Sequence, residues 1–279
     1  MSTPRGEVLR IAASMTVVCV LGAAVLGGIY AATERYAAAA RLTSERRAIT
    51  EMLGLPGSAP VLEVSQFLDP ARREVVYRTA PFGRAGVPPH QVVFTLDGAL
   101  VSQDSLAPAG ERAVKGLTPL GRMFLARRGG RPAGFVIEGT TRGYKNRIRF
   151  FVALSGSWEL LGVRVVEHEE DPGLGAEVAT PWFQGQFVGR SADALRSVEV
   201  TKQPMPEDWR AALAQLQRTP LDQWKAAHGE LLARERSRPI YAVTGATISS
   251  RALTDGVRLT VSHFRRRWEL LAPYLGAAS

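Results

Sequence analysis

The apolar positions of the chain first form one unbroken block near the N-terminus. Ile11 to Thr33 is a stretch of 23 residues without a charged side chain. As a helix it would be about 35 Å long, enough to cross the roughly 30 Å hydrocarbon core of a bilayer. We therefore predict a transmembrane anchor over residues 11–33, behind a short tail of residues 1–10. A cleaved signal peptide and a buried core helix are the alternatives.

After the anchor the apolar positions are spaced for a helix and then for strands. Residues 34–56 predict a juxtamembrane helix and linker that end among glycines and prolines. The turn signals Asp97-Gly98 and Ser155-Gly156-Ser157 each lie between two apolar segments and predict hairpins. Residues 147–154 are apolar on both faces, which indicates a strand covered on both sides. Strands are predicted at residues 74–79, 91–96, 99–103, 134–140, 147–154 and 158–167.

Helical spacing dominates the last third of the chain. Helices are predicted over Glu207–Gln217, over Leu221–Ala233, and from Thr247 to about Leu271, just before Pro273. The last helix has one apolar stripe, which is the ordinary way a helix packs on a core. The fold class is therefore α+β: one transmembrane helix, then one mostly antiparallel domain over residues 57–279.

Composition narrows the class of protein. Of the 279 residues 46% are hydrophobic and 22% charged, which excludes a wholly disordered or fibrous chain. Lys and Arg exceed Asp and Glu by 35 to 26, so a nucleic-acid or anionic-surface binder is one hypothesis. No nucleic-acid motif accompanies the short arginine clusters, and we predict no nucleic-acid partner. The single Cys excludes an internal disulfide and, with four His, argues against a structural zinc site.

Two stretches carry candidate chemistry. The first, from Tyr241 to Arg251, contains Thr244-Gly245-Ala246-Thr247 where a loop turns into the last helix. Thr247 or Ser249 could cap the free amides of the first turn, and the same geometry could bind a phosphate through backbone amides. The second stretch is Glu167–Gly175, an acidic turn whose bend is at Pro172-Gly173. A metal site at His168 is an alternative that extended geometry disfavours, because neighbouring side chains point to opposite faces.

Both stretches resemble one family. Thr244-Gly245-Ala246-Thr247 is similar to the motif of the FMN-binding domain in the G subunit of the Rnf electron-transport complex, a relative of the C subunit of the sodium-pumping NADH:quinone reductase. The segment from His168 to Gly175 is similar to that family's His-x-Glu-Thr-Pro-Gly-Leu-Gly. The two motifs stand in the family's order, roughly 75 residues apart, behind one anchor helix.

The resemblance implies a cofactor and its binding residues. FMN would be joined to Thr247 by a phosphoester bond, installed by a flavin transferase, with Ser249 as the fallback acceptor. Thr244 and the amides of Gly245 and Ala246 would hold the phosphate. Gly173 and Gly175 would be small to let the flavin ring approach, and Leu174 and Gly175 would contact it. No catalytic residue and no metal ligand are predicted.

The resemblance also implies a role and a location. The chain would be an electron-transfer subunit of a membrane-bound, ion-translocating oxidoreductase, and would make no product of its own. Its partners would be the other membrane subunits of an Rnf-like complex. It would cross the bacterial inner membrane once, with its soluble domain in the periplasm. The arginines after the anchor, such as Arg46 and Arg47, favour the opposite orientation weakly.

The sequence departs from the family pattern at three places. Tyr241 stands where the family usually has Asp, six residues before the acceptor, and Asp171 replaces a usual Thr. Residues 204–238 are predicted to form a helical insertion. These departures favour two alternatives: a stand-alone, membrane-anchored FMN protein or regulator, and a binding domain that keeps the fold without flavin attachment.

Overall fold

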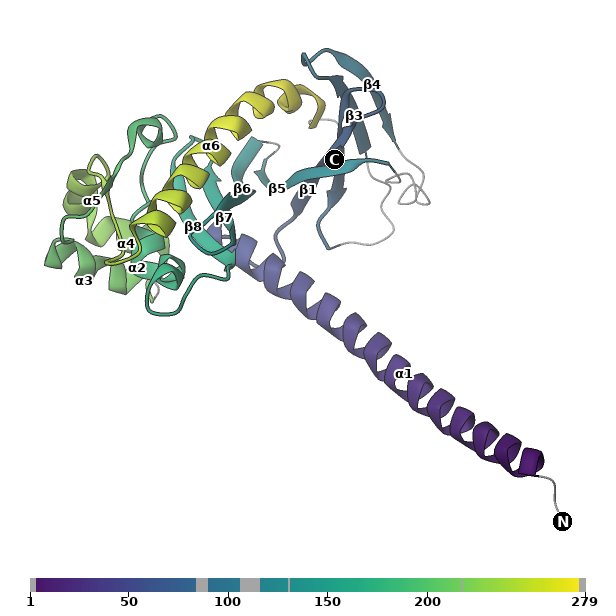
Figure 1. Ribbon diagram of the computed structural model, residues 1–279. Helices are drawn as coiled ribbons and strands as arrows, with labels where there is room; N and C mark the ends of the chain where they lie inside the picture. Colours follow the sequence, from purple (N-terminus) through teal and green to yellow (C-terminus); the bar gives the residue numbers. More distant parts are fainter. Residues whose placement is uncertain (1–3, 84–89, 106–115, 130, 217, 276–279) are drawn as a thin grey trace. The chain divides into compact units, whose positions relative to one another are not determined.

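Figure 1 presents a computed structural model, which describes residues 4–83, 90–105, 116–129, 131–216 and 218–275. The chain divides into two compact units, residues 1–47 and residues 48–279. Residues 1–3 of the predicted tail and the last four residues, 276–279, lie outside the described residues.

The first unit is part of one long helix, α1 (Pro4–Met52). Leu9–Met52 is long and apolar enough to cross a membrane by length and composition. None of its most apolar window is buried among the described residues, unlike the core helix of a soluble protein. The last turn of α1, from Ala48 to Met52, belongs to the second unit.

The second unit is built on an antiparallel sheet. Its order among the described residues is β4-β3-β2-β1-β5-β6-β7-β8, and all neighbours are antiparallel. Both predicted hairpins are confirmed, β3–β4 around Asp97-Gly98 and β7–β8 around Ser155–Ser157. The strands are β1 (Val61–Asp69), β2 (Glu74–Pro81), β3 (His90–Thr95), β4 (Leu100–Ser105), β5 (Thr118–Arg128), β6 (Arg131–Arg142), β7 (Arg147–Ser155) and β8 (Leu160–Glu167).

Two of these strands, β1 and β5, are not predicted by the sequence pattern. They pair with each other in the middle of the sheet, and the register shifts between Gln66 and Phe67. The shift is a bulge that interrupts the two-residue period. The apolar positions of β1 therefore lack the clean alternation that identifies a strand.

The sheet buries both faces, as the pattern of β7 predicts. Ile148, Phe150 and Val152 belong to the larger core, which α6 (Thr247–Leu275) covers in Figure 1. Phe151 and Ala153 point to the opposite face, where they pack with the end of α1 through Ile49 and Met52. Alternation along an extended strand sends neighbouring side chains to these two cores.

α6 runs along the larger core with its apolar stripe inward, as predicted. The buried residues of that stripe are Leu253, Val257, Val261, Phe264, Leu271 and Leu275. The predicted end before Pro273 is wrong, because α6 continues through Pro273 to Leu275. The proline costs only a hydrogen bond near the helix end. Leu275 is buried and the Tyr274 ring lies 5.6 Å from that of Phe94, which offsets this loss.

The segment between β8 and α6 holds short elements. They are η2 (Gly175–Ala179), α2 (Pro181–Gly185), η3 (Ala194–Ser197), β9 (Val200–Thr201), α3 (Glu207–Leu216), α4 (Leu221–Ala227), α5 (Gly229–Glu235) and β10 (Ile240–Tyr241). Residue 217, the predicted end of α3, lies outside the described residues.

The single helix predicted over Leu221–Ala233 is wrong. The chain forms two helices, α4 and α5, that meet at His228, whose backbone leaves the helical region with φ −120° and ψ 26°. Gly229, which follows, has a low helix propensity that favours such a break. The break lets Trp224 of α4 reach α3, where its ring nitrogen donates to the carbonyl of Ala212 at 2.7 Å.

Candidate functional site

The loop that carries the Thr-Gly-Ala-Thr motif is held at both ends. On one side, Ile240 and Tyr241 of β10 pair in parallel with Val200 and Thr201 of β9. On the other side, α6 begins at Thr247. Gly245 has a φ of +78°, a left-handed conformation that favours glycine. The motif therefore turns a strand directly into the N-terminus of a long helix.

The hydroxyl that closes this turn belongs to Ser250, not to Thr247 or Ser249. Ser250 Oγ accepts a hydrogen bond from the amide of Val243 at 3.0 Å and donates to the carbonyl of Ala246 at 2.9 Å. Ser249 is buried and donates its hydroxyl to Glu170 Oε2. Thr247 is half-buried and Thr244 exposed, so their side chains stay accessible.

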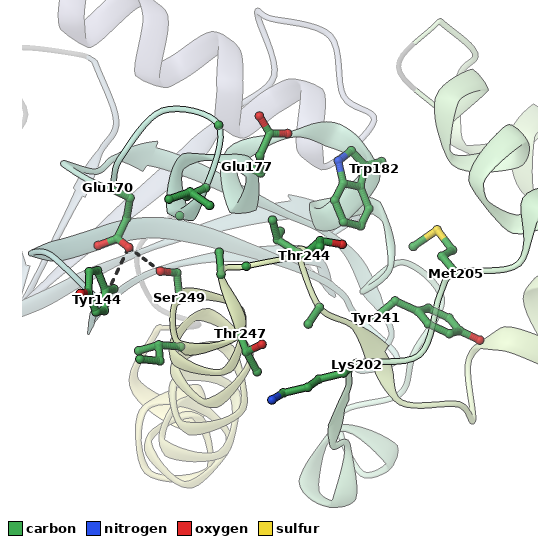
Figure 2. Close-up of a pocket in the computed structure, with 18 of the residues that line it drawn as sticks. Tyr144, Glu170, Glu177, Trp182, Lys202, Met205, Tyr241, Thr244, Thr247 and Ser249 are labelled. Atoms are coloured by element: carbon green, nitrogen blue, oxygen red, sulfur yellow. Dashed lines mark hydrogen bonds between the residues drawn. The ribbon is translucent and has the colours of Figure 1, made fainter.

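Both motifs line one cavity of about 970 Å³, drawn in Figure 2. Its volume lies in the range of small-molecule and cofactor sites. Every predicted cofactor-binding residue is on its wall: Gly173, Leu174, Gly175, Thr244, Gly245, Ala246, Thr247 and Ser249. The structure therefore brings together two segments that lie far apart in the sequence.

A buried carboxylate joins the two segments. Glu170 accepts hydrogen bonds from the backbone amides of Tyr144, Lys145 and Asn146 at 3.2, 2.9 and 3.3 Å. Its fourth donor is the hydroxyl of Ser249, in the first turn of α6. Glu170 thus ties the turn between β6 and β7 to the start of α6.

The environment of Glu170 favours its charged form. Burial acts to raise the pKa of Glu170, but the hydrogen bonds from Ser249 and the three amides outweigh it, so the pKa is lowered.

Two glycines leave room for this carboxylate. A Cβ on Gly143 would clash with Glu170 Oε1, and one on Gly175 would lie 2.5 Å from Glu170 Oε2. Gly175 is therefore small because it packs on Glu170.

The glycine-rich turn also touches the motif loop directly. The side chain of Leu174 is half-exposed, and a Cβ on Gly245 would lie 3.0 Å from its Cδ2 atom. Gly173 has a φ of +73°, a conformation that favours glycine. A Cβ added there would meet no atom within 4 Å, so the position requires glycine for its backbone conformation and not because a side chain would clash. Whether a ring contacts Leu174 or Gly173 stays a prediction.

The cavity is also lined by residues that sequence reasoning does not assign to the site. The guanidinium carbon of Arg210 lies 5.9 Å from the centre of the Trp182 ring, a cation–π contact. Lys202 and Met205 line the same cavity. Lys202 follows the two-residue strand β9, and Arg210 lies in the predicted insertion. A strand of two residues is too short to show an alternation of apolar and polar positions. The sequence pattern therefore gave no signal that could have identified Lys202.

Tyr241, where the sequence departs from the family pattern, is buried in a polar network. Its hydroxyl donates to Glu235 Oε2 at 3.2 Å, and its backbone exchanges two hydrogen bonds with the Gln186 side chain at 2.8 and 3.1 Å. Arg190, 2% exposed, donates to the Gln186 carbonyl and to three carbonyls between residues 235 and 238. Burial lowers the pKa of Arg190 to about 10, against the opposing effect of Glu235. This network connects the end of α5 to β10, the strand that leads into the motif.

The metal alternative finds no support in the part of the chain that the structure describes. There, no three or more His, Cys, Asp or Glu side chains form a group that could hold a metal ion. Near His168, Asp171 forms an ion pair with Lys145 at 2.7 Å, and Glu169 accepts a hydrogen bond from Asn146.

The fold and the cavity define an α+β ligand-binding domain behind a helix that could span a membrane. Residues 143–262 match the family model of the FMN-binding domain, and this stretch contains both motifs. This match confirms the resemblance drawn from the motifs.

Two curated relatives have similar sequences. Over 138 residues the chain is 28% identical to the G subunit of the proton-translocating ferredoxin:NAD(+) oxidoreductase complex of Clostridium ljungdahlii, covering 50% of this chain and 57% of that protein. Over 173 residues it is 31% identical to the G subunit of the ion-translocating oxidoreductase complex of Cereibacter sphaeroides, covering 61% of each. The chain thus spans less than two thirds of the length of these relatives.

A solved structure, that of Shewanella oneidensis NqrC, matches with a TM-score of 0.47 and 15% identity. The match covers 80% of this chain and 93% of that one.

Proposed function

We propose that the chain is an electron-transfer subunit of a membrane-bound, ion-translocating oxidoreductase of the Rnf type, with FMN joined to Thr247 by a phosphoester bond. One observation carries the proposal. Thr247 is the first residue of α6 and lies on the wall of a cavity inside the stretch that matches the FMN-binding domain.

The residues around Thr247 fit an esterified phosphate. The N-terminus of α6 offers free backbone amides and the positive end of the helix dipole, which favour an anion. Gly245, with its positive φ, turns the backbone toward that position without a side chain. Lys202 lines the same cavity and adds a positive charge. The cavity of about 970 Å³ is large enough for a nucleotide-sized cofactor.

The hydroxyl groups near the helix start differ in their availability. Thr247 is half-buried on the cavity wall, whereas Ser249 is 1% exposed and its hydroxyl is bound to Glu170. Esterification of Ser249 would remove a donor from a buried carboxylate, which is costly. This difference supports Thr247 as the acceptor and Ser249 only as the fallback.

In this proposal FMN, when bound, supplies the chemistry of accepting and passing on electrons. The protein supplies position and environment. Thr247 holds the phosphate end, Thr244 and the amide of Gly245 surround it, and Leu174 contacts the ring. The predicted role of the Ala246 amide is not retained, because that amide donates to the carbonyl of Val243 at 3.0 Å. A covalent link keeps the cofactor from dissociating between electron transfers.

The proposal extends to location and partners. α1 anchors the chain in the inner membrane, and the folded domain lies on the periplasmic side. The partners are other membrane subunits of an Rnf-like complex, and a flavin transferase attaches the FMN. The names of the relatives, which are G subunits of ion-translocating complexes, support this assignment. The FMN-binding domain would extend over residues 57–279, with the segment 204–238 as a helical insertion.

The test is the intact mass of the full chain, produced with and without an active flavin transferase. We expect the mass to increase by one FMN less one water only with the transferase, and not in Thr247→Ala. Ser249→Ala is the matched control, which loses a nearby hydroxyl and should still gain the flavin. No increase in the wild-type chain, or an increase that survives Thr247→Ala, would contradict the covalent assignment.

A further inference from the structure

We infer that Lys202 is the side chain that recognises the phosphate of the flavin and makes the cavity prefer FMN over a flavin without phosphate. This inference rests on the proposed function, because it assigns a role within the same cavity. It concerns a residue that neither motif contains.

The cavity wall carries the acidic residues Glu170, Asp171 and Glu177 and the basic residues Lys202 and Arg210, and the contacts of the two basic residues single out Lys202. The carboxylate of Glu170 is used by three amides and Ser249, and Asp171 is paired with Lys145 at 2.7 Å. The guanidinium of Arg210 lies over the Trp182 ring. Among the ion pairs of the described residues none includes Lys202, whose side chain is exposed to the cavity. Such a cation is available for an anionic ligand.

The backbone fixes where Lys202 stands. It directly follows β9, and β9 pairs with β10 so that Thr201 lies opposite Tyr241. The amide of Ala242 donates to the carbonyl of Thr201 at 2.9 Å, which extends this pairing toward the motif loop. The amide of Gln203 is bound to Thr201 Oγ1 at 3.1 Å, so the chain is also held after Lys202. The two-stranded sheet thus sets Lys202 in register with the loop that leads to Thr247.

The direction of the side chain agrees with this role. Figure 2 shows Lys202 extending toward Thr247, whereas Trp182 lies across the cavity from both. The ammonium group and the N-terminus of α6 therefore face the same part of the cavity. An ammonium and a helix N-terminus both favour an anion, and a phosphate placed between them would be bound by both.

The experiment compares FMN with riboflavin, which has the same ring and side chain but no phosphate. The full chain is produced without flavin transferase, so that binding stays non-covalent, and both dissociation constants are measured by quenching of flavin fluorescence. We expect the wild type to bind FMN more tightly. Lys202→Gln should weaken FMN binding about twofold to fivefold, a range suited to an exposed charge pair, and leave riboflavin binding unchanged.

Two further variants and a salt series sharpen the comparison. Lys202→Arg keeps the charge and should restore most of the preference for FMN. Arg266→Gln, which removes an exposed positive charge of α6 outside this cavity, controls for net charge and should leave both affinities unchanged. Raising the salt concentration should reduce the preference for FMN in the wild type and have little effect in Lys202→Gln.

The outcomes separate this inference from the proposed function. If the wild type binds both flavins but Lys202→Gln keeps the preference for FMN, or weakens both flavins equally, the inference is wrong and the FMN site stands. If the wild type binds neither flavin, the proposed function fails, and the role of Lys202 fails with it.

Discussion

Replacing Glu170 with Gln tests whether this buried carboxylate holds the site together. The change removes the negative charge from an acceptor of four hydrogen bonds, three from backbone amides and one from Ser249. A hydrogen bond to a charged group contributes about 1 kcal/mol more to stability than a hydrogen bond to a neutral group. The neutral Gln also avoids the cost of burying a charge, which offsets part of this loss of stability. We expect a loss of about 2–4 kcal/mol, or about 4–16 °C in Tm for a folded unit of this size.

The assay is thermal unfolding of the full chain in detergent, followed by tryptophan fluorescence. Glu169→Gln is the matched control, because Glu169 is the exposed neighbour and accepts a hydrogen bond from the Asn146 side chain. It should change stability by less than about 0.5 kcal/mol. Equal shifts for the two variants, or an unchanged Tm for Glu170→Gln, would refute the reasoning.

The difference in Tm between the wild type and Glu170→Gln should also depend on pH. The pKa of Glu170 is lowered in the folded chain, so its charged form stabilises the fold at a pH above its unfolded pKa of about 4.3. This stabilisation is lost as the pH falls through the lower, folded pKa. The difference in Tm between wild type and Glu170→Gln should therefore be constant above about pH 5 and shrink toward pH 3.

Two other substitutions have defined outcomes. Gly245→Ala should cost about 1–2 kcal/mol and lower flavin incorporation, because the φ is +78° and the new Cβ would lie 3.0 Å from Leu174; an unchanged Tm would contradict this. Arg190→Met should cost about 3 kcal/mol or more, since it leaves the backbone carbonyls of residues 186, 235, 236 and 238 without their donor, and should expose the segment 204–238 to limited proteolysis. Retained protease resistance there would show that Arg190 does not hold this segment in place.

Local patterns predicted the elements whose residues are neighbours in sequence. The two hairpins follow from Asp97-Gly98 and Ser155–Ser157, and the α6 stripe follows from its helical period. Prediction failed where a long-range contact overrides the local preference. α6 passes through Pro273 because the residues beyond it are buried, and β1 was missed because its bulge against β5 breaks the period.

The sequence alone determined the long apolar helix, the two motifs and the loop that turns into the last helix, because each depends on residues that are close together in the chain. Only the tertiary structure decided what surrounds the motifs. Glu170 meets Ser249 across 79 positions, and Lys202 reaches the cavity through the pairing of two short strands. Such contacts depend on how a sheet and a helix pack, and no local period encodes them.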